Sequence, residues 1–111
     1  MNKSMKFEVV SAKNTNGELS YVKHAGVSFC KDNDDYFKLN LNVWPTVNYF
    51  VAKNHSNKNY TIFSKKVMVE GGVKFQNPVG YARTIENLKT HMFLKFEVPN
   101  VSLYMSLCPS N

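Results

Sequence analysis

Hydrophobic and polar residues alternate with a period of two along much of the chain, which is typical of β-strands with one buried face. The alternation is clearest in residues 36–44, 92–98 and 101–107. The residues predicted to point inward are Phe37, Leu39, Leu41, Val43, Met92, Leu94, Phe96, Val98, Val101, Leu103, Met105 and Leu107. In the first of these segments Tyr36, Lys38 and Trp44 are predicted to point outward. The pattern therefore predicts amphipathic strands at these three places.

Turn signals divide the rest of the chain into further strands. Residues 14–17 read Asn-Thr-Asn-Gly, and Asn-Gly tolerates the positive φ angles of a tight hairpin turn. We expect strands on either side of this turn, over residues 5–13 and 18–30, with a bulge or a sharp bend at Gly26. The other predicted features are strands over residues 46–53, 60–69 and 73–75, a turn at Gly71-Gly72, and a strand end at Asn77-Pro78.

Residues 79–90 are the ambiguous part of the chain. Thr84 is a suitable N-cap for a short helix near residues 84–90, and Glu86 would lie in the first turn of that helix. The sequence alone leaves open whether this helix forms.

Seven or eight short strands and at most one short helix predict an all-β fold. We expect a small antiparallel β-barrel, comparable to the OB-type barrels that bind oligonucleotides, or a β-sandwich. The 111 residues are expected to form one globular domain, residues 1–111. No apolar run is long enough for a membrane helix or a secretory leader, so no membrane association is predicted and we expect a cytoplasmic protein.

The net charge is +6, and most of the surplus lies in one part of the chain. Residues 53–83 contain six basic residues and one acidic residue. A clustered surplus of positive charge favours a polyanionic partner, although it is also what a solvated, lysine-rich face would show. Lysine outnumbers arginine 13 to 1 and asparagine occurs 14 times, as in AT-rich coding sequences. These features fit a phage or mobile-element accessory protein.

The sequence holds no motif that indicates catalysis. Three histidines and eight acidic residues show no spacing typical of a catalytic group, a phosphate-binding loop or a metal site. Cys30 and Cys108 are too few for a metal cage and are expected to be reduced thiols. We therefore predict a protein that is not an enzyme, with no cofactor and no metal.

Aromatic residues among lysines on outward faces give the most specific functional signal. A two-residue turn at Pro99-Asn100 would pair Lys95 with Tyr104 and place Phe93 on the same outward surface. Exposed rings can stack on bases while ammonium groups contact phosphates, which is how many proteins bind single strands. The alternative is that these rings are buried beneath another segment. The candidate nucleic-acid-binding residues are Tyr36, Lys38, Trp44, Lys53, Lys58, Tyr60, Lys65, Lys66, Lys74, Arg83, Phe93, Lys95 and Tyr104.

Two functional hypotheses follow. The first is a DNA- or RNA-binding module that contacts single-stranded or structured nucleic acid without sequence specificity, because a single arginine argues against base-specific reading of duplex DNA. The second is a protein-binding module, such as a phage- or plasmid-encoded inhibitor, that docks on the acidic surface of a host nucleic-acid enzyme. A homodimer is a further possibility if the strand over residues 101–107 lies at a sheet edge.

Overall fold

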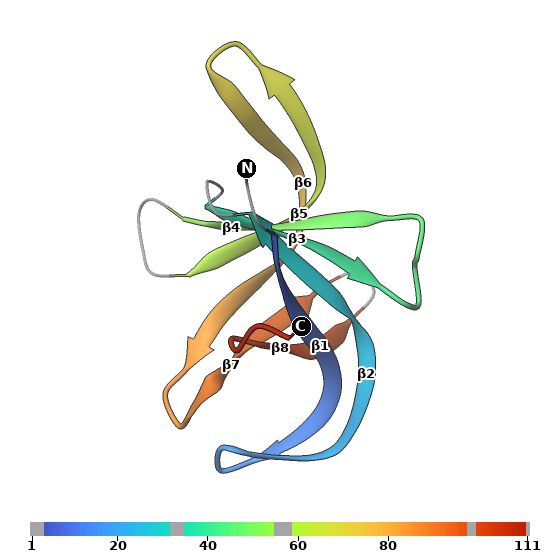
Figure 1. Ribbon diagram of the computed structural model, residues 1–111, viewed down its shortest axis with the longest axis vertical. Helices are drawn as coiled ribbons and strands as arrows, with labels where there is room; N and C mark the ends of the chain where they lie inside the picture. Colours follow the sequence, from blue (N-terminus) through green and yellow to red (C-terminus); the bar gives the residue numbers. More distant parts are fainter. Residues whose placement is uncertain (1–3, 32–34, 55–58, 98–99, 111) are drawn as a thin grey trace.

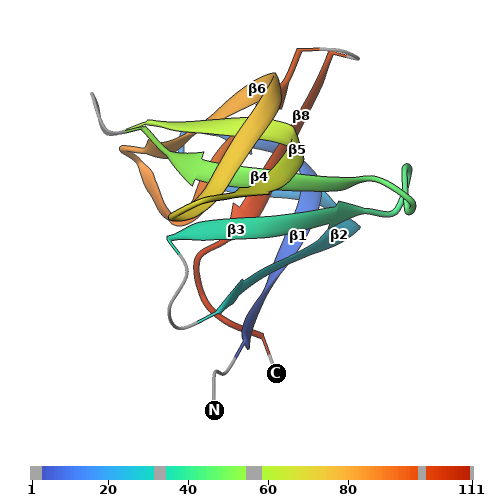
Figure 2. The same cartoon turned by 90° about the horizontal axis from the view of Figure 1, so that it is seen from above.

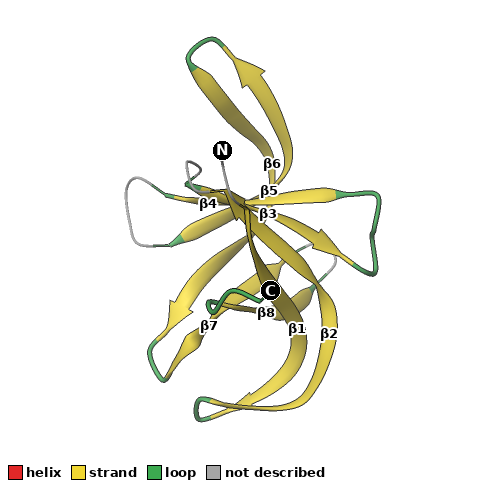
Figure 3. Ribbon diagram, viewed as in Figure 1, coloured by secondary structure: helices red, strands yellow, loops and turns green. Residues whose placement is uncertain are grey.

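The computed structural model describes residues 4–31, 35–54, 59–97 and 100–110, and it contains eight antiparallel strands (Figure 1). Among the described residues there is no helix (Figure 3). The strands are β1 (Ser4–Thr15), β2 (Glu18–Lys31), β3 (Tyr36–Leu41), β4 (Asn48–Lys53), β5 (Tyr60–Val69), β6 (Gly72–Ile85), β7 (Leu88–Phe96) and β8 (Val101–Ser106). The predicted all-β fold is confirmed.

Each strand pairs with the next strand in the sequence, and β8 pairs with β1 to close the sheet. Figure 2 shows β3, β4 and β5 side by side in this arrangement. The sequential order is that of an up-and-down barrel, which differs from the Greek-key order of an OB fold. Because β8 is paired on both sides, dimerisation through a free β8 edge, as considered from the sequence, is not possible over the paired residues.

The inward side chains form the main hydrophobic core. Its fully buried members include Val9, Leu39, Ile62, Leu94 and Met105, each from a different strand. The inward positions predicted in residues 92–96 and 101–107 are confirmed, since these side chains are buried or pack against the core. Val98 lies outside the described residues.

The predicted turn at Asn16-Gly17 and the predicted bulge at Gly26 are confirmed. Asn16 and Gly17 have φ angles of 54° and 88° and connect β1 to β2. Gly26 adjoins a bulge, because Val9 pairs with Gly26 whereas Val10 pairs with His24. A Cβ atom at Gly26 would collide with the backbone carbonyl oxygen of Asn40, so the close approach of β2 and β3 requires glycine there.

Two predictions about β6 are wrong. The short helix near residues 84–90 is absent: β6 continues to Ile85, and a turn at Glu86-Asn87 leads into β7. Asn77-Pro78 does not end a strand either, because β6 passes through it. Asn77 adopts a positive φ of 59°, and the β5–β6 register shifts next to Pro78. The dipeptide therefore bends a continuous strand.

The strand predicted over residues 36–44 is shorter than expected. It ends at Leu41, and the Trp44 and Val47 amides donate hydrogen bonds to the carbonyls of Leu41 (3.2 Å) and Trp44 (3.1 Å) as the chain turns. Val43, predicted to point inward, is 72% exposed. Trp44, predicted to point outward, is partly buried against the core.

Two hairpins extend beyond the closed sheet toward opposite ends of its long axis (Figure 1). The first joins β1 and β2. The second, residues 64–77, is here called the β5–β6 arm, because β5 and β6 pair only with each other over this length. Each hairpin covers part of the outer surface of the barrel, and this decides which outward side chains remain accessible.

Candidate nucleic-acid interface

The β5–β6 arm covers the outward ring predicted on β3. Phe75 of the arm packs against Tyr36, Phe50 and Phe63, with ring centroids 5.1, 5.8 and 5.6 Å away. Lys66 donates a hydrogen bond from Nζ to the Tyr36 hydroxyl (3.2 Å) and lies 5.4 Å from the centre of that ring. Tyr36 is therefore partly buried and is not an open stacking surface.

The lysines of the arm are divided between its two faces. Cross-strand partners share a face, and successive pairs alternate. Lys66 pairs with Phe75 on the face toward the barrel, whereas Lys65 pairs with Gln76 and Lys74 with Val67 on the other face. The arm therefore presents only Lys65 and Lys74 together, and the predicted cationic cluster is split.

The β1–β2 hairpin covers a second predicted ring. Tyr104 points outward but is buried with Val10 and Leu88, and Ala12 and Leu19 of the hairpin pack against this small outer cluster. Gly17 at the tip of the hairpin approaches the backbone of Asn87 so closely that a Cβ atom would collide with it. The outer face of β8 is therefore closed to a ligand at Tyr104.

Other candidates lie apart from these clusters. Tyr60 packs against the main core from the start of β5. Lys53 is exposed at the end of β4, where it pairs with Tyr60. Lys58 lies outside the described residues. Neither Tyr60 nor Lys53 joins a larger site among the described residues.

Four residues on β6 and β7 form the best-defined arrangement of rings and cations on the outer surface. Tyr81 pairs directly with Lys95, and Arg83 pairs directly with Phe93. The four side chains lie at the corners of a rectangle formed by the two pairs. The Tyr81 and Phe93 rings occupy one diagonal, with centroids 6.4 Å apart, and the two cations occupy the other. The Arg83 guanidinium lies over the Phe93 ring at 5.0 Å. We call these four residues the β6–β7 platform.

The predicted pairing of β7 with β8 is wrong by two residues. Phe96 pairs with Val101, so Phe93 faces Tyr104 and Lys95 faces Ser102. β7 ends at Phe96 and β8 begins at Val101. Pro99 of the predicted two-residue turn lies outside the described residues. Because a shift of two keeps every side chain on its own face, Phe93, Lys95 and Tyr104 still share the outward surface.

The platform is accessible and carries positive charge. Tyr81 is 40% exposed, Arg83 is exposed, and Phe93 and Lys95 are partly exposed. Lys95 donates hydrogen bonds to Asn100 and, at 3.4 Å, to the Ser102 hydroxyl, both neutral groups. Within the described part of the chain the one ion pair is His24 with Glu8, so neither platform cation is neutralised by a carboxylate.

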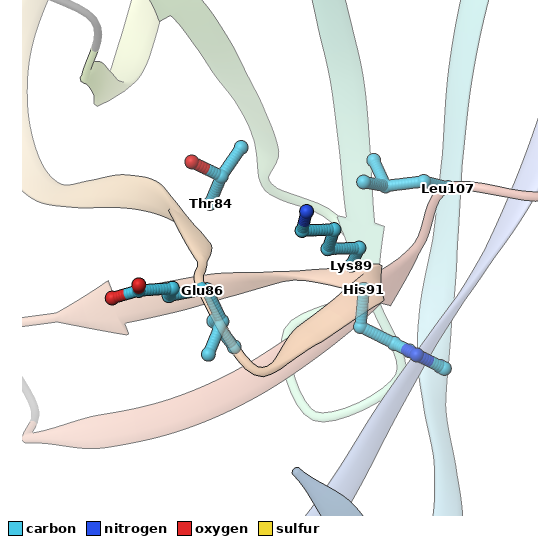
Figure 4. A pocket seen from close by; sticks show the side chains of 6 residues that line it. Thr84, Glu86, Lys89, His91 and Leu107 are labelled. Carbon is cyan, nitrogen blue, oxygen red and sulfur yellow. The ribbon is translucent and has the colours of Figure 1, made fainter.

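A shallow depression of about 390 Å³ lies beside the turn between β6 and β7 (Figure 4). It is lined by Thr84, Ile85, Glu86, Lys89, His91 and Leu107. Burial lowers the pKa of His91, and the charge of Glu8 opposes this shift. The Glu86 carboxylate and the His91 imidazole point in opposite directions, so they do not converge on one reacting group (Figure 4). No cluster of metal-ligating side chains occurs in the described ranges.

Comparison with known proteins finds no matching family model, no matching curated protein and no matching solved structure. Across the described residues there is no helix long and apolar enough to cross a membrane.

Sequence reasoning missed two outward rings. Tyr81 lay in the ambiguous segment over residues 79–90, where a strand would have placed it two positions from Arg83 on one face. Phe29 lay on a strand interrupted by Gly26, where the bulge obscures the alternation. In both cases the ring became evident only once the register was fixed.

Proposed function

We propose that the protein binds single-stranded or structured nucleic acid without sequence specificity, and that the β6–β7 platform is its principal contact surface. The observation that carries this proposal is the diagonal arrangement of Tyr81 and Phe93 with Arg83 and Lys95. Rings and cations alternate there on adjacent strands, and no carboxylate neutralises the cations within the described residues.

This arrangement matches the two physical requirements of single-strand binding. A base stacked on an aromatic side chain contributes about 1–3 kcal/mol, and any base can stack. Cations placed beside the ring contact the phosphates that flank the stacked base, which makes the affinity dependent on salt. Tyr81 is the more exposed ring, so it is the expected stacking partner, while Arg83 holds Phe93 beside it.

The test is the affinity of a labelled oligothymidine for the wild-type protein and for Tyr81→Ala, measured by fluorescence anisotropy at low salt. Loss of one stacked base is expected to weaken binding roughly 5- to 150-fold, corresponding to about 1–3 kcal/mol. Tyr21→Ala is the matched control, because Tyr21 is 81% exposed on the β1–β2 hairpin, away from the platform. Equal affinities for all three proteins, or no binding by the wild type, would overturn the proposal.

A second candidate function is supported by the tip of the β5–β6 arm. Met68 is 75% exposed, and Val69 and Val73 beside it are also exposed. Exposed apolar groups that cluster on a projecting hairpin are typical of protein-binding surfaces. Lys65 and Lys74 lie behind the tip, so a fitting partner is an apolar groove with an acidic rim, such as one on a host nucleic-acid enzyme.

The two functions are separated by a variant of the arm. Met68→Ser removes apolar surface at the tip and leaves the platform unchanged. The nucleic-acid proposal predicts that its affinity for oligothymidine equals that of the wild type. Docking on a partner through the arm predicts that Met68→Ser weakens the complex with that partner while Tyr81→Ala does not.

A further inference from the structure

A second exposed ring among lysines lies on β1, β2 and β3. Phe29 is 37% exposed, and its direct partners are Lys6 on β1 and Lys38 on β3. Lys31, two residues further along β2, is on the same face. Three lysines therefore surround one accessible ring.

These side chains are on the outside of the barrel, as the burial of their neighbours shows. Ser28 is fully buried on β2 and pairs with Phe7 and Leu39, which are both buried. Lys6, Phe29 and Lys38 are each one residue away from these positions and so point to the opposite face. All three are exposed.

The charge around Phe29 is not compensated by ion pairs within the described residues. The carboxylate on the same face of β1 is Glu8, two residues from Lys6, and its oxygen lies 3.1 Å from Nδ1 of His24. The lysines are therefore available to an anionic ligand. Lys38 also faces Phe50, over which the Lys66 ammonium lies at 5.5 Å, so positive charge continues from Phe29 to the base of the β5–β6 arm.

This site and the platform lie on different sides of the molecule. Phe29 is on β2 and Tyr81 is on β6, and in the closed order of eight strands these are four strands apart in either direction. Neighbouring strands are about 4.8 Å apart, so the path over the surface is about 19 Å. A ligand of two or three nucleotides stacked at one ring is too short to contact the other ring as well.

We infer that Lys6, Phe29, Lys31 and Lys38 form a second binding site for single-stranded nucleic acid, so that one protein molecule holds two strands, or two distant segments of one strand. The inference rests on the proposed function for the class of ligand. It adds a separate location, a stoichiometry of two short oligonucleotides per protein molecule, and the capacity to bring two strands together.

The first test is calorimetric titration with an oligothymidine of about three nucleotides, which at ~3.4 Å per nucleotide is too short to reach from one ring to the other. The wild type is expected to bind two oligonucleotides. Phe29→Ala and Tyr81→Ala are each expected to bind one, and the double variant none. Lys38→Glu keeps the ring and is expected to weaken the second site alone, which separates loss of contact from loss of fold.

The outcomes distinguish this inference from the proposed function. A wild-type stoichiometry of one that Tyr81→Ala abolishes and Phe29→Ala leaves unchanged would overturn the second site and keep the platform. A stoichiometry of one that only Phe29→Ala abolishes would overturn the platform as the principal surface and also the claim of two sites. No binding by the wild type or by any variant would overturn both the second site and the platform.

The bridging capacity has its own readout. Two non-complementary oligothymidines carrying a donor and an acceptor dye are mixed with substoichiometric wild-type protein. Energy transfer is expected when the protein is added, and it should disappear with either Phe29→Ala or Tyr81→Ala. Transfer that persists in both single variants would contradict bridging by two sites on one molecule.

Discussion

A side chain on this barrel is placed inside or outside by its position relative to the nearest bulge or turn. Val9 and Val10 are adjacent, yet Val9 belongs to the main core and Val10 to the outer cluster beneath the β1–β2 hairpin. Val9 is buried inside the barrel, whereas Val10 is buried because the hairpin folds back over the outer face. Burial therefore does not identify the inside of the barrel, and an outward position does not guarantee exposure.

Ser28 is the polar exception in the interior. Its hydroxyl is fully buried and has no hydrogen-bond partner among the described residues. Because an unsatisfied buried hydroxyl costs about 1–3 kcal/mol, Ser28→Ala is expected to raise the free energy of unfolding by about 1 kcal/mol in urea denaturation. Ser106→Ala is the control, since the Ser106 hydroxyl hydrogen-bonds with the backbone of Cys108 at 3.2 Å. An equal gain in both variants would contradict this account of Ser28.

Trp44 gives a prediction at the same scale. It packs against the core at the turn between β3 and β4 and takes no part in the platform. Oligothymidine bound at Tyr81 is therefore expected to leave Trp44 emission nearly unchanged, whereas a tryptophan introduced by Tyr81→Trp should be quenched in the same titration. Strong quenching of Trp44 in the wild type would place the nucleic acid at the β3–β4 turn instead.

At the scale of elements, Phe75 supplies the aromatic contacts of the β5–β6 arm with the barrel, beside the contacts of Lys66 with Tyr36 and Phe50. Phe75→Ala removes the contacts with Tyr36, Phe50 and Phe63. We expect the free energy of unfolding to fall by about 2 kcal/mol. This is less than the ~3–5 kcal/mol that replacing a fully buried Phe by Ala costs, because Phe75 is only partly buried. Limited trypsin digestion should then cleave faster after Lys65 and Lys74.

Val73→Ala is the matched control for the arm, because Val73 lies on the same face but further out and is 38% exposed. It should leave both the stability and the cleavage rate near those of the wild type. Equal protection of the arm in Phe75→Ala and in the wild type would show that Phe75 does not anchor it.

The strands themselves were largely predictable from the sequence, but the hairpins that pack over their outer faces were not. Alternation located β7 and β8, and Asn16-Gly17 located the first hairpin turn, because these signals are local. The β7–β8 register was missed by two residues because β7 ends at Phe96, whereas the predicted strand continued to residue 98. The burial of Tyr104 and Tyr36 depends on hairpins folding over them, and alternation within a strand carries no information about such contacts.

At the scale of the whole molecule, closure of the sheet sets how the surface can be used. Every strand has a partner on both sides within the barrel, so over the paired residues ligands meet side chains and not free backbone. The β6–β7 platform and the site around Phe29 lie on opposite sides of the barrel. This separation is why two independent contacts, and not one continuous groove, follow from the fold.

The stability of the whole fold should depend on pH through His91. Burial lowers the pKa of His91 below 6.5, so the unfolded chain takes up this proton before the folded protein does. The free energy of unfolding is therefore expected to fall as the pH drops below about 6.5, and this loss levels off below the folded pKa. His91→Gln should show a smaller decrease in its urea midpoint between about pH 8 and pH 5.5. An identical decrease in both proteins would contradict this role of His91.

The most direct test of nucleic-acid binding by the platform is the salt dependence of oligothymidine affinity, compared between the wild type and Lys95→Ala. Each phosphate contact on a single strand contributes about 0.7 to the slope of log K against log salt concentration. The account predicts steeply salt-dependent binding by the wild type and a slope that is shallower by about 0.7 in Lys95→Ala. Absence of binding at low salt, or identical slopes for the two proteins, would contradict it.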